Sequence, residues 1–297
     1  VTVNVPALMM MQSELNDGHD LNDIMPGKPR GNIAQVYAHR FVERIVRRFD
    51  YLVDLHTASF GRINSLYVRA DMTNPSVAQM AYLQRPQIIL HNPPSDGTLR
   101  GAADELDIPA ITVEIGNPHQ FQPAYIKRAL TGLRGVMGEI GMLPRRQVSL
   151  GHPPVLCQRS AWMYTDHGGL LEVFPDVTHR IARGQVVARL GDAYGDVVRE
   201  YRAAEDGIVI GKSVNPAAQT GARILHLGVV VDPNEGSFTS RERASHSVRG
   251  KAQSVSSMPA VSGDEALGPG ERGSGDAPKP KASKPKGCEL SAPSRAE

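Results

Sequence analysis

An acid and a histidine at the end of an apolar run are the first residues with chemistry to offer. The segment from Tyr51 to Leu55 predicts a buried strand that delivers His56 into a small, polar turn. Side chains two apart in a strand point the same way, so Asp54 can orient the His56 imidazole, although a structural role for Asp54 is equally open. Because ligands of α/β sheets gather beyond the carboxyl ends of strands, His56 is a candidate metal or catalytic residue, the alternative being a structural histidine.

The elements that would position His56 alternate between strands and helices. Residues 35–48 and 121–140 have the periodicity of helices, and Ala110–Glu114 is a further apolar strand with an acid at its carboxyl end. We also expect an inner strand at Val1–Val5. The alternation predicts that residues 1–145 form an α/β sheet with helices on both faces.

The pattern changes in the second half of the chain. Residues 156–231 contain short strands rich in valine and isoleucine between glycines, which predicts a separate, small all-β sandwich or barrel. Residues 234–297 are rich in Ser, Pro, Gly, Lys and Glu and have no apolar periodicity. We expect this tail to be disordered, because it cannot bury enough surface to offset its chain entropy.

Composition limits the compartment and the partners. The 297 residues carry a formal charge of +2, spread along the chain, which does not indicate a nucleic-acid or anionic-membrane partner. The two cysteines, Cys157 and Cys288, lie far apart and fit a reducing, cytoplasmic compartment better than a disulfide framework. No apolar run approaches the ~20 residues that a membrane span requires, and we expect no signal peptide. Oligomeric state stays open.

Three motifs in order resemble one enzyme family. They are Asp20-Leu21-Asn22 before a Pro-Gly pair, the segment DLHTAS at residues 54–59, and Arg100 followed by PAITVEIG at residues 109–116. Together they resemble the succinylglutamate desuccinylase/aspartoacylase family, a branch of the zinc-carboxypeptidase-like fold. Any single motif is weak, but the ordered set is specific. The resemblance covers about residues 1–231 and implies a mixed sheet flanked by helices, followed by a barrel-sandwich-like β domain.

The resemblance also implies roles for residues. His56 matches a ligand of one Zn²⁺, and Glu114 matches the general base that takes a proton from the metal-bound water. Arg100 matches an arginine that holds a substrate carboxylate, and Asn22 matches an asparagine that shapes the substrate pocket. Glu114 and Arg100 could instead be an ordinary edge residue and a surface arginine. We expect His56 and Glu114 to face one cavity, with Arg100 at its rim.

Two departures from the family pattern affect the expected function. The family's His-x-x-Glu pair, which supplies the other two zinc ligands, does not occur before Asp20, and we expect it upstream of Val1 in a chain that has lost its start. Asp23 stands where the family has an arginine, so an anion replaces a cation that would attract a substrate carboxylate.

Two functions follow from these observations. The first is zinc-dependent hydrolysis of the amide bond of a small N-acyl amino-acid-like substrate, with residues 1–297 expected to be inactive as a fragment. The alternative is a non-catalytic remnant or pseudoenzyme that binds a small molecule or a partner protein.

Overall fold

A computed structural model describes residues 3–95, 97–145 and 152–231 of the chain. The predicted disordered tail, residues 234–297, lies outside the described residues. Within the described residues, no helix combines the length and apolar character needed to cross a membrane.

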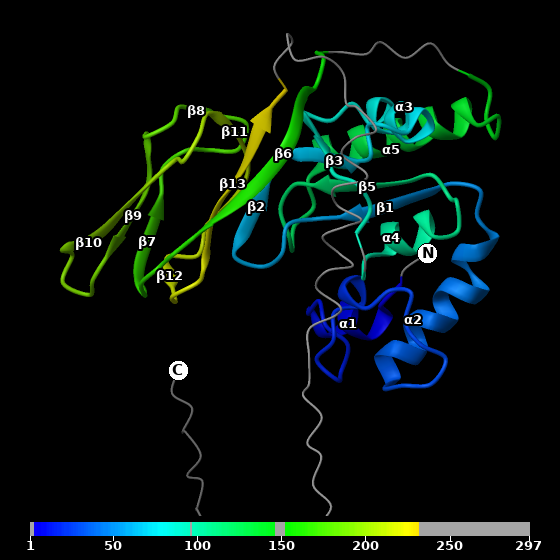
Figure 1. The fold of residues 1–297 in the computed structure, drawn as a ribbon, viewed down its shortest axis with the longest axis horizontal. Helices are drawn as coiled ribbons and strands as arrows, with labels where there is room; N and C mark the ends of the chain where they lie inside the picture. The colour runs from blue at the N-terminus through cyan, green and yellow to red at the C-terminus, as the bar shows by residue number, and fades with distance from the viewer. Residues whose placement is uncertain (1–2, 96, 146–151, 232–297) are drawn as a thin grey trace, which may run out of the picture. The chain divides into compact units, whose positions relative to one another are not determined.

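The first half of the chain contains both helices and strands, which alternate from β3 to α5 (Figure 1). The helices are α1 (Val5–Met10), α2 (Ile33–Arg44), α3 (Pro75–Leu83), α4 (Leu99–Asp104) and α5 (Pro123–Glu139), with short 3-10 helices η1 (Leu21–Asp23) and η2 (Val46–Arg48). The strands are β1 (Leu52–His56), β2 (Arg62–Asn64), β3 (Leu66–Ala70), β4 (Ile88–His91) and β5 (Ala110–Ile115). The described residues 152–231 form strands only: β6 (Val155–Tyr164), β7 (Gly169–Val173), β8 (Arg180–Ile181), β9 (Val186–Gly191), β10 (Val197–Arg202), β11 (Gly207–Ser213), β12 (Ala217–Ala218) and β13 (Arg223–Val230).

The strand that we expected at Val1–Val5 is not present in its described part, residues 3–5. Val5 instead begins α1, because the Asn4 side chain accepts a hydrogen bond from Ala7 N and caps the helix, while Pro6 fits its first turn. The apolar alternation of this segment therefore did not predict its conformation, because the Asn4 cap and Pro6 favour a helix.

A mixed nine-stranded sheet runs through both halves of the chain. Its order is β1-β5-β3-β4-β6-β13-β11-β2, with β8 paired to β11. The β1–β5, β3–β4 and β4–β6 pairs are parallel, and the β5–β3 pair is antiparallel. The sheet thus joins strands from either side of the boundary that we expect near residue 150. Whether each side folds alone stays a prediction, which circular dichroism of the separate pieces tests.

The two faces of the sheet pack against different helices. Helices α3 and α5 cover one face, where Val77 and Val136 share a core with Ile111 and Val113 of β5. Helices α2 and α4 lie on the other side of β1 and β5, where their cluster includes Ala110 of β5. Figure 1 shows these helix pairs on opposite sides of β1 and β5. Alternate residues of each strand therefore have opposite environments, as the strand repeat requires.

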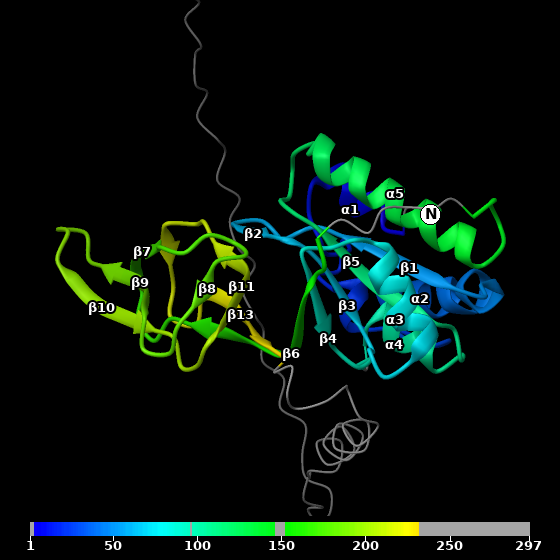
Figure 2. The same ribbon diagram turned by 90° about the horizontal axis from the view of Figure 1, so that it is seen from above.

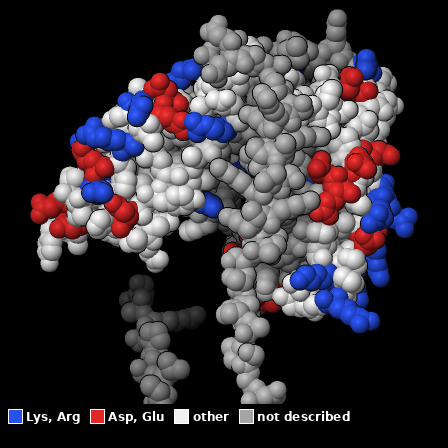
Figure 3. Space-filling model, viewed as in Figure 1, with Lys and Arg blue, Asp and Glu red and all other residues white. Residues whose placement is uncertain are grey.

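The β-rich half contains a second sheet. Strands β10-β9-β7-β12 form a four-stranded sheet, and its residues Leu171 and Leu190 share a core with Val209 of β11 and Leu225 of β13. Figure 2 shows this sheet at the end of the molecule away from the helices. Acidic and basic side chains are interspersed over the visible face, as Figure 3 shows, which agrees with the small net charge.

A substitution at Gly228 of β13 tests how closely this strand packs against β6 and β11. A Cβ atom at Gly228 would lie 2.7 Å from Cys157 Sγ and 2.9 Å from Ile210 Cδ1, so Gly228→Ala should lower the free energy of unfolding by about 1–3 kcal/mol through overpacking. Urea unfolding measures the change. Gly191→Ala is the matched control, because the nearest atom to its Cβ would be 3.4 Å away. Equal stability of the two variants would contradict the packing described for β13.

Candidate active site

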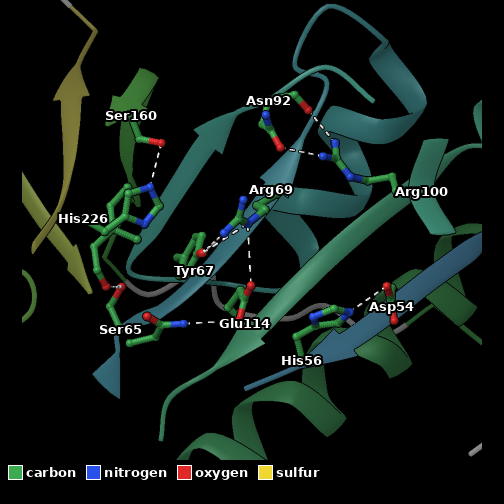
Figure 4. Close-up of polar contacts among 12 residues, drawn as sticks. Asp54, His56, Ser65, Tyr67, Arg69, Asn92, Arg100, Glu114, Ser160 and His226 are labelled. Carbon is green, nitrogen blue, oxygen red and sulfur yellow. Dashed lines mark hydrogen bonds and ion pairs between the residues drawn. The ribbon is translucent and has the colours of Figure 1, made fainter. Parts of the chain in front are cut away.

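Alternation along three neighbouring strands brings the polar side chains to one face of the sheet. Ile111 and Val113 pack toward α3 and α5, so Glu114 points to the opposite face. His56 is paired with Glu114 in the parallel β1–β5 register, and Tyr67 is paired with Glu114 in the antiparallel β3–β5 register. Figure 4 shows His56, Glu114 and Tyr67 on adjacent strands. The register therefore places the predicted histidine and the predicted acid side by side.

His56 and Asp54 form a hydrogen-bonded pair. His56 Nε2 lies 2.9 Å from Asp54 Oδ2, and both side chains are partly buried. Burial alone would lower the pKa of His56, but its hydrogen bond to Asp54 and the charges of Asp54 and Glu114 outweigh that effect and raise the pKa above its ordinary value. The structure thus brings Asp54 to the imidazole, as its spacing of two residues indicated.

Glu114 is held by neighbours on two strands. The residue is 6 % exposed; Oε2 accepts a hydrogen bond from Asn64 Nδ2 at 3.3 Å, and Oε1 lies 3.6 Å from Arg69 Nε. Arg69 also donates to the Tyr67 hydroxyl from Nη2 at 2.7 Å and from Nε at 3.1 Å. Burial, followed by the charge of Glu114, raises the pKa of Tyr67. A buried carboxylate needs such partners, and these fix its orientation.

A cleft of about 630 Å³ lies beside β1 and contains several of the predicted residues. Asn22, Asp54 and His56 line it together with Asp20. Asn22 Oδ1 accepts a hydrogen bond from Leu99 N at the start of α4, which ties the DLN segment to that helix. Asp23, the departure from the family pattern, is exposed and does not line this cleft.

Arg100 occupies a buried position on α4 rather than an exposed rim. It is 3 % exposed, and its Nη2 donates to Asn92 Oδ1 at 2.6 Å, while Nη1 donates to Asn92 O. Burial, with the nearby charge of Arg69, lowers the pKa of Arg100 to about 10. Arg100 does not line the cleft that contains His56, and its substrate-binding role stays a prediction.

An aromatic stack from the β-rich half continues the row of polar side chains. The His226 ring stacks on Trp162 at 4.7 Å between centroids, and it lies edge-on to Tyr67 at 6.2 Å. His226 Nε2 is 2.8 Å from Ser160 Oγ. Burial and then the charges of Arg69, Arg223 and Arg62 lower the pKa of His226 to about 3. The imidazole is therefore neutral at physiological pH.

Sequence reasoning missed Tyr67, Asn64 and His226 and did not select Arg69. The signal for two of them was present: in Leu66–Ala70, apolar residues alternate with Tyr67 and Arg69, which puts both on the polar face of a strand. Asn64 and His226 reach the site through pairing between strands far apart in the sequence, which no local pattern reveals.

The described residues do not form a complete zinc site by themselves. Among them, no group of three or more His, Cys, Asp and Glu side chains is arranged to hold a metal ion. His56 has a carboxylate partner, as metal-bound histidines often do, but a catalytic zinc site has three protein ligands. The donors present around His56 therefore do not fit the zinc that the family resemblance implies.

The structure is a mixed α/β fold in which His56 of the edge strand β1 is paired with Glu114 of the neighbouring strand β5. Residues 1–140 match the model of the succinylglutamate desuccinylase/aspartoacylase catalytic domain. This part of the chain belongs to that family, as the ordered motifs predicted.

Curated and solved relatives are similar over much of the chain. The N-alpha-acetyl-L-2,4-diaminobutyric acid deacetylase of Halomonas elongata is 23% identical over 234 residues, which are 73% of this chain and 67% of the relative. The product-bound structure of the ectoine utilization protein EutE (DoeB) from Ruegeria pomeroyi has a TM-score of 0.69 at 22% identity, over 76% of this chain and 73% of that one. A succinylglutamate desuccinylase structure from Silicibacter sp. TM1040 has a TM-score of 0.67 at 24% identity, over 77% and 73%. These structures share the large mixed sheet.

The neutral, buried His226 predicts a pH dependence of stability. The folded pKa of about 3 lies below the ordinary 6.5, so the unfolded chain binds the proton more readily and stability is lost as pH falls below about 6.5. From about pH 7 to about pH 5, this group should remove about 2 kcal/mol from the free energy of unfolding. Urea unfolding at both pH values measures the loss, which should be absent in His226→Phe.

His152→Gln is the control, because His152 is exposed and its loss should leave the pH dependence unchanged. A wild-type pH dependence that persists in His226→Phe would show that His226 is not the group responsible.

Proposed function

We propose that the site is that of an amidohydrolase that removes the acyl group from a small N-acyl amino acid. The carrying observation is the register that pairs His56 with Glu114 in a domain of the succinylglutamate desuccinylase/aspartoacylase family. The Halomonas elongata relative, whose name gives an N-acetyl amino acid as substrate, supports this reaction class.

Glu114 is the residue that we assign to proton transfer. A carboxylate fixed by Asn64 and Arg69 can accept a proton from an attacking water and return it to the leaving amine, provided the substrate amide lies above it. The Tyr67 hydroxyl accepts a hydrogen bond from the same Arg69 that is paired with this carboxylate. Asn22 in the neighbouring cleft is our candidate for contact with the substrate.

Zinc enters this proposal only because the resemblance to the family implies a zinc-dependent reaction. Bound in a three-ligand site, zinc would lower the pKa of a water molecule and polarise the amide carbonyl. Because the described residues offer His56 without two further ligands, we propose that residues 1–297 bind zinc weakly and do not hydrolyse amides as they stand. The alternative function is non-catalytic binding of a small molecule, which the same missing donor set favours.

Metal analysis of purified residues 1–297, after dialysis against a weak chelator, tests this proposal. We expect far less than one zinc per chain, no release of amine from N-acetyl or N-succinyl amino acids, and no effect of His56→Ala on metal content. His39→Ala is the control, since His39 does not line the cleft.

Near-stoichiometric zinc that is lost in His56→Ala would show that other residues complete the site. If such a protein is active, Glu114→Gln should lower kcat by about 10²-fold or more, because the general base is lost, while zinc remains bound. Activity unaffected by Glu114→Gln would refute the assignment of Glu114.

A further inference from the structure

Two arginines lie against Trp162, the single tryptophan of the chain. The guanidinium carbon of Arg223 is 5.1 Å from the Trp162 ring centroid, and that of Arg62 is 5.6 Å from it. Among the described residues, no carboxylate lies within ion-pair distance of either guanidinium group. The other arginine that lies over a ring in the β-rich half, Arg189 above Phe174, is paired with Glu200 at 3.1 Å. Arg62 and Arg223 therefore differ from Arg189, whose charge is paired with that of a carboxylate.

Their positive charge is only partly balanced by acids among the described residues. Arg62, Arg69 and Arg223 all act electrostatically on His226, which is neutral, so three cations converge on this region. Glu114 is the carboxylate that offsets part of this charge, and it is already bonded to Arg69. Burial and the repulsion from Arg223 lower the pKa of Arg62. Holding two like charges against one ring is unfavourable, and an anionic group between them would relieve it.

The arginines lie at one end of a series of side-chain contacts that leads to the candidate catalytic acid. Trp162 and His226 are stacked, His226 meets Tyr67, and Tyr67 is bonded through Arg69 to the Glu114 side. Figure 4 shows His226, Tyr67, Glu114 and His56 in a row across the sheet. A ligand lying along this row would have one end near Glu114 and the other near Trp162.

We propose that Arg62 and Arg223, seated on Trp162, form a subsite for a carboxylate of the N-acyl amino-acid substrate. The inference rests on the proposed function. It adds two residues, Arg62 and Arg223, that would recognise the negative charge of the substrate. A guanidinium group binds a carboxylate through two parallel hydrogen bonds, and its other face can remain on an aromatic ring. The carboxylate can belong to the amino acid, as in an N-acetyl amino acid, or to the acyl group, as in a succinyl amide. In either case the subsite orients the amide toward Glu114.

Trp162 provides the readout, because it is the only tryptophan in the sequence. Its fluorescence is titrated with three small amides: N-acetylglycine, which carries the amino-acid carboxylate, succinamic acid, which carries the acyl-side carboxylate, and N-acetylglycinamide, which carries neither. Isothermal calorimetry repeats each titration. We expect saturable binding of at least one of the two acids and none of the neutral amide, and the acid that binds identifies the source of the carboxylate.

Arg62→Gln and Arg223→Gln should each weaken that binding by about tenfold or more, the effect of one lost charge-assisted contact. Arg189→Gln is the matched control and should bind as the wild type does. Arg223→Lys keeps the charge without the planar fork and should recover part of the affinity, which separates recognition from a folding defect. Thermal melts check that each variant is folded.

Two results would overturn the subsite: equal binding of N-acetylglycinamide and the acids, or wild-type affinity in both glutamine variants. The titrations need no turnover and no metal. A failure of the amidohydrolase proposal in the zinc and activity assays is therefore distinguishable from a failure of the arginine subsite here.

Discussion

Side-chain alternation across β1, β5 and β3 is the constraint on which the site depends. Each of these strands sends apolar residues to the core under α3 and α5, and each therefore sends its intervening residues to the opposite face. A shift of one residue in the register would exchange the two sets, burying Glu114 among aliphatic side chains and exposing Val113. The hydrophobic core thus fixes the register, and the register brings His56, Glu114 and Tyr67 together.

Charge balance explains how this polar face is kept ordered. Glu114 is 6 % exposed, and a buried carboxylate would be unfavourable alone; Arg69 and Asn64 compensate for its lost hydration. The same Arg69 anchors Tyr67, which connects the α/β half to His226 of β13. The β-rich half thus contributes His226, which lies edge-on to Tyr67, and Trp162, which stacks on His226.

The sequence predicted the parts of this arrangement that depend on local pattern. The strand before His56 and the strand bearing Glu114 follow from their apolar runs, and the Asp54–His56 contact follows from the spacing of two residues; the structure contains all three. It did not predict that Arg100 would be buried against Asn92, because that position depends on how α4 packs.

Strand pairing between segments that lie far apart in the sequence could not be predicted from the sequence either. Asn64 lies on β2, which pairs with β11 about 150 residues later in the chain, and this places the β-rich half beside the site. Register between such segments is set by tertiary packing, whereas sequence patterns report only on neighbours along the chain.

The most direct measurement of the central claim is the pKa of His56, followed by NMR titration of its ring protons. The account places Glu114 close enough to His56 to raise that pKa, so Glu114→Gln should lower it, and Asp54→Asn should lower it as well. Asp50→Asn, an exposed acid just before β1, should leave it unchanged. A His56 pKa that does not move in Glu114→Gln would contradict a site shared by these two residues.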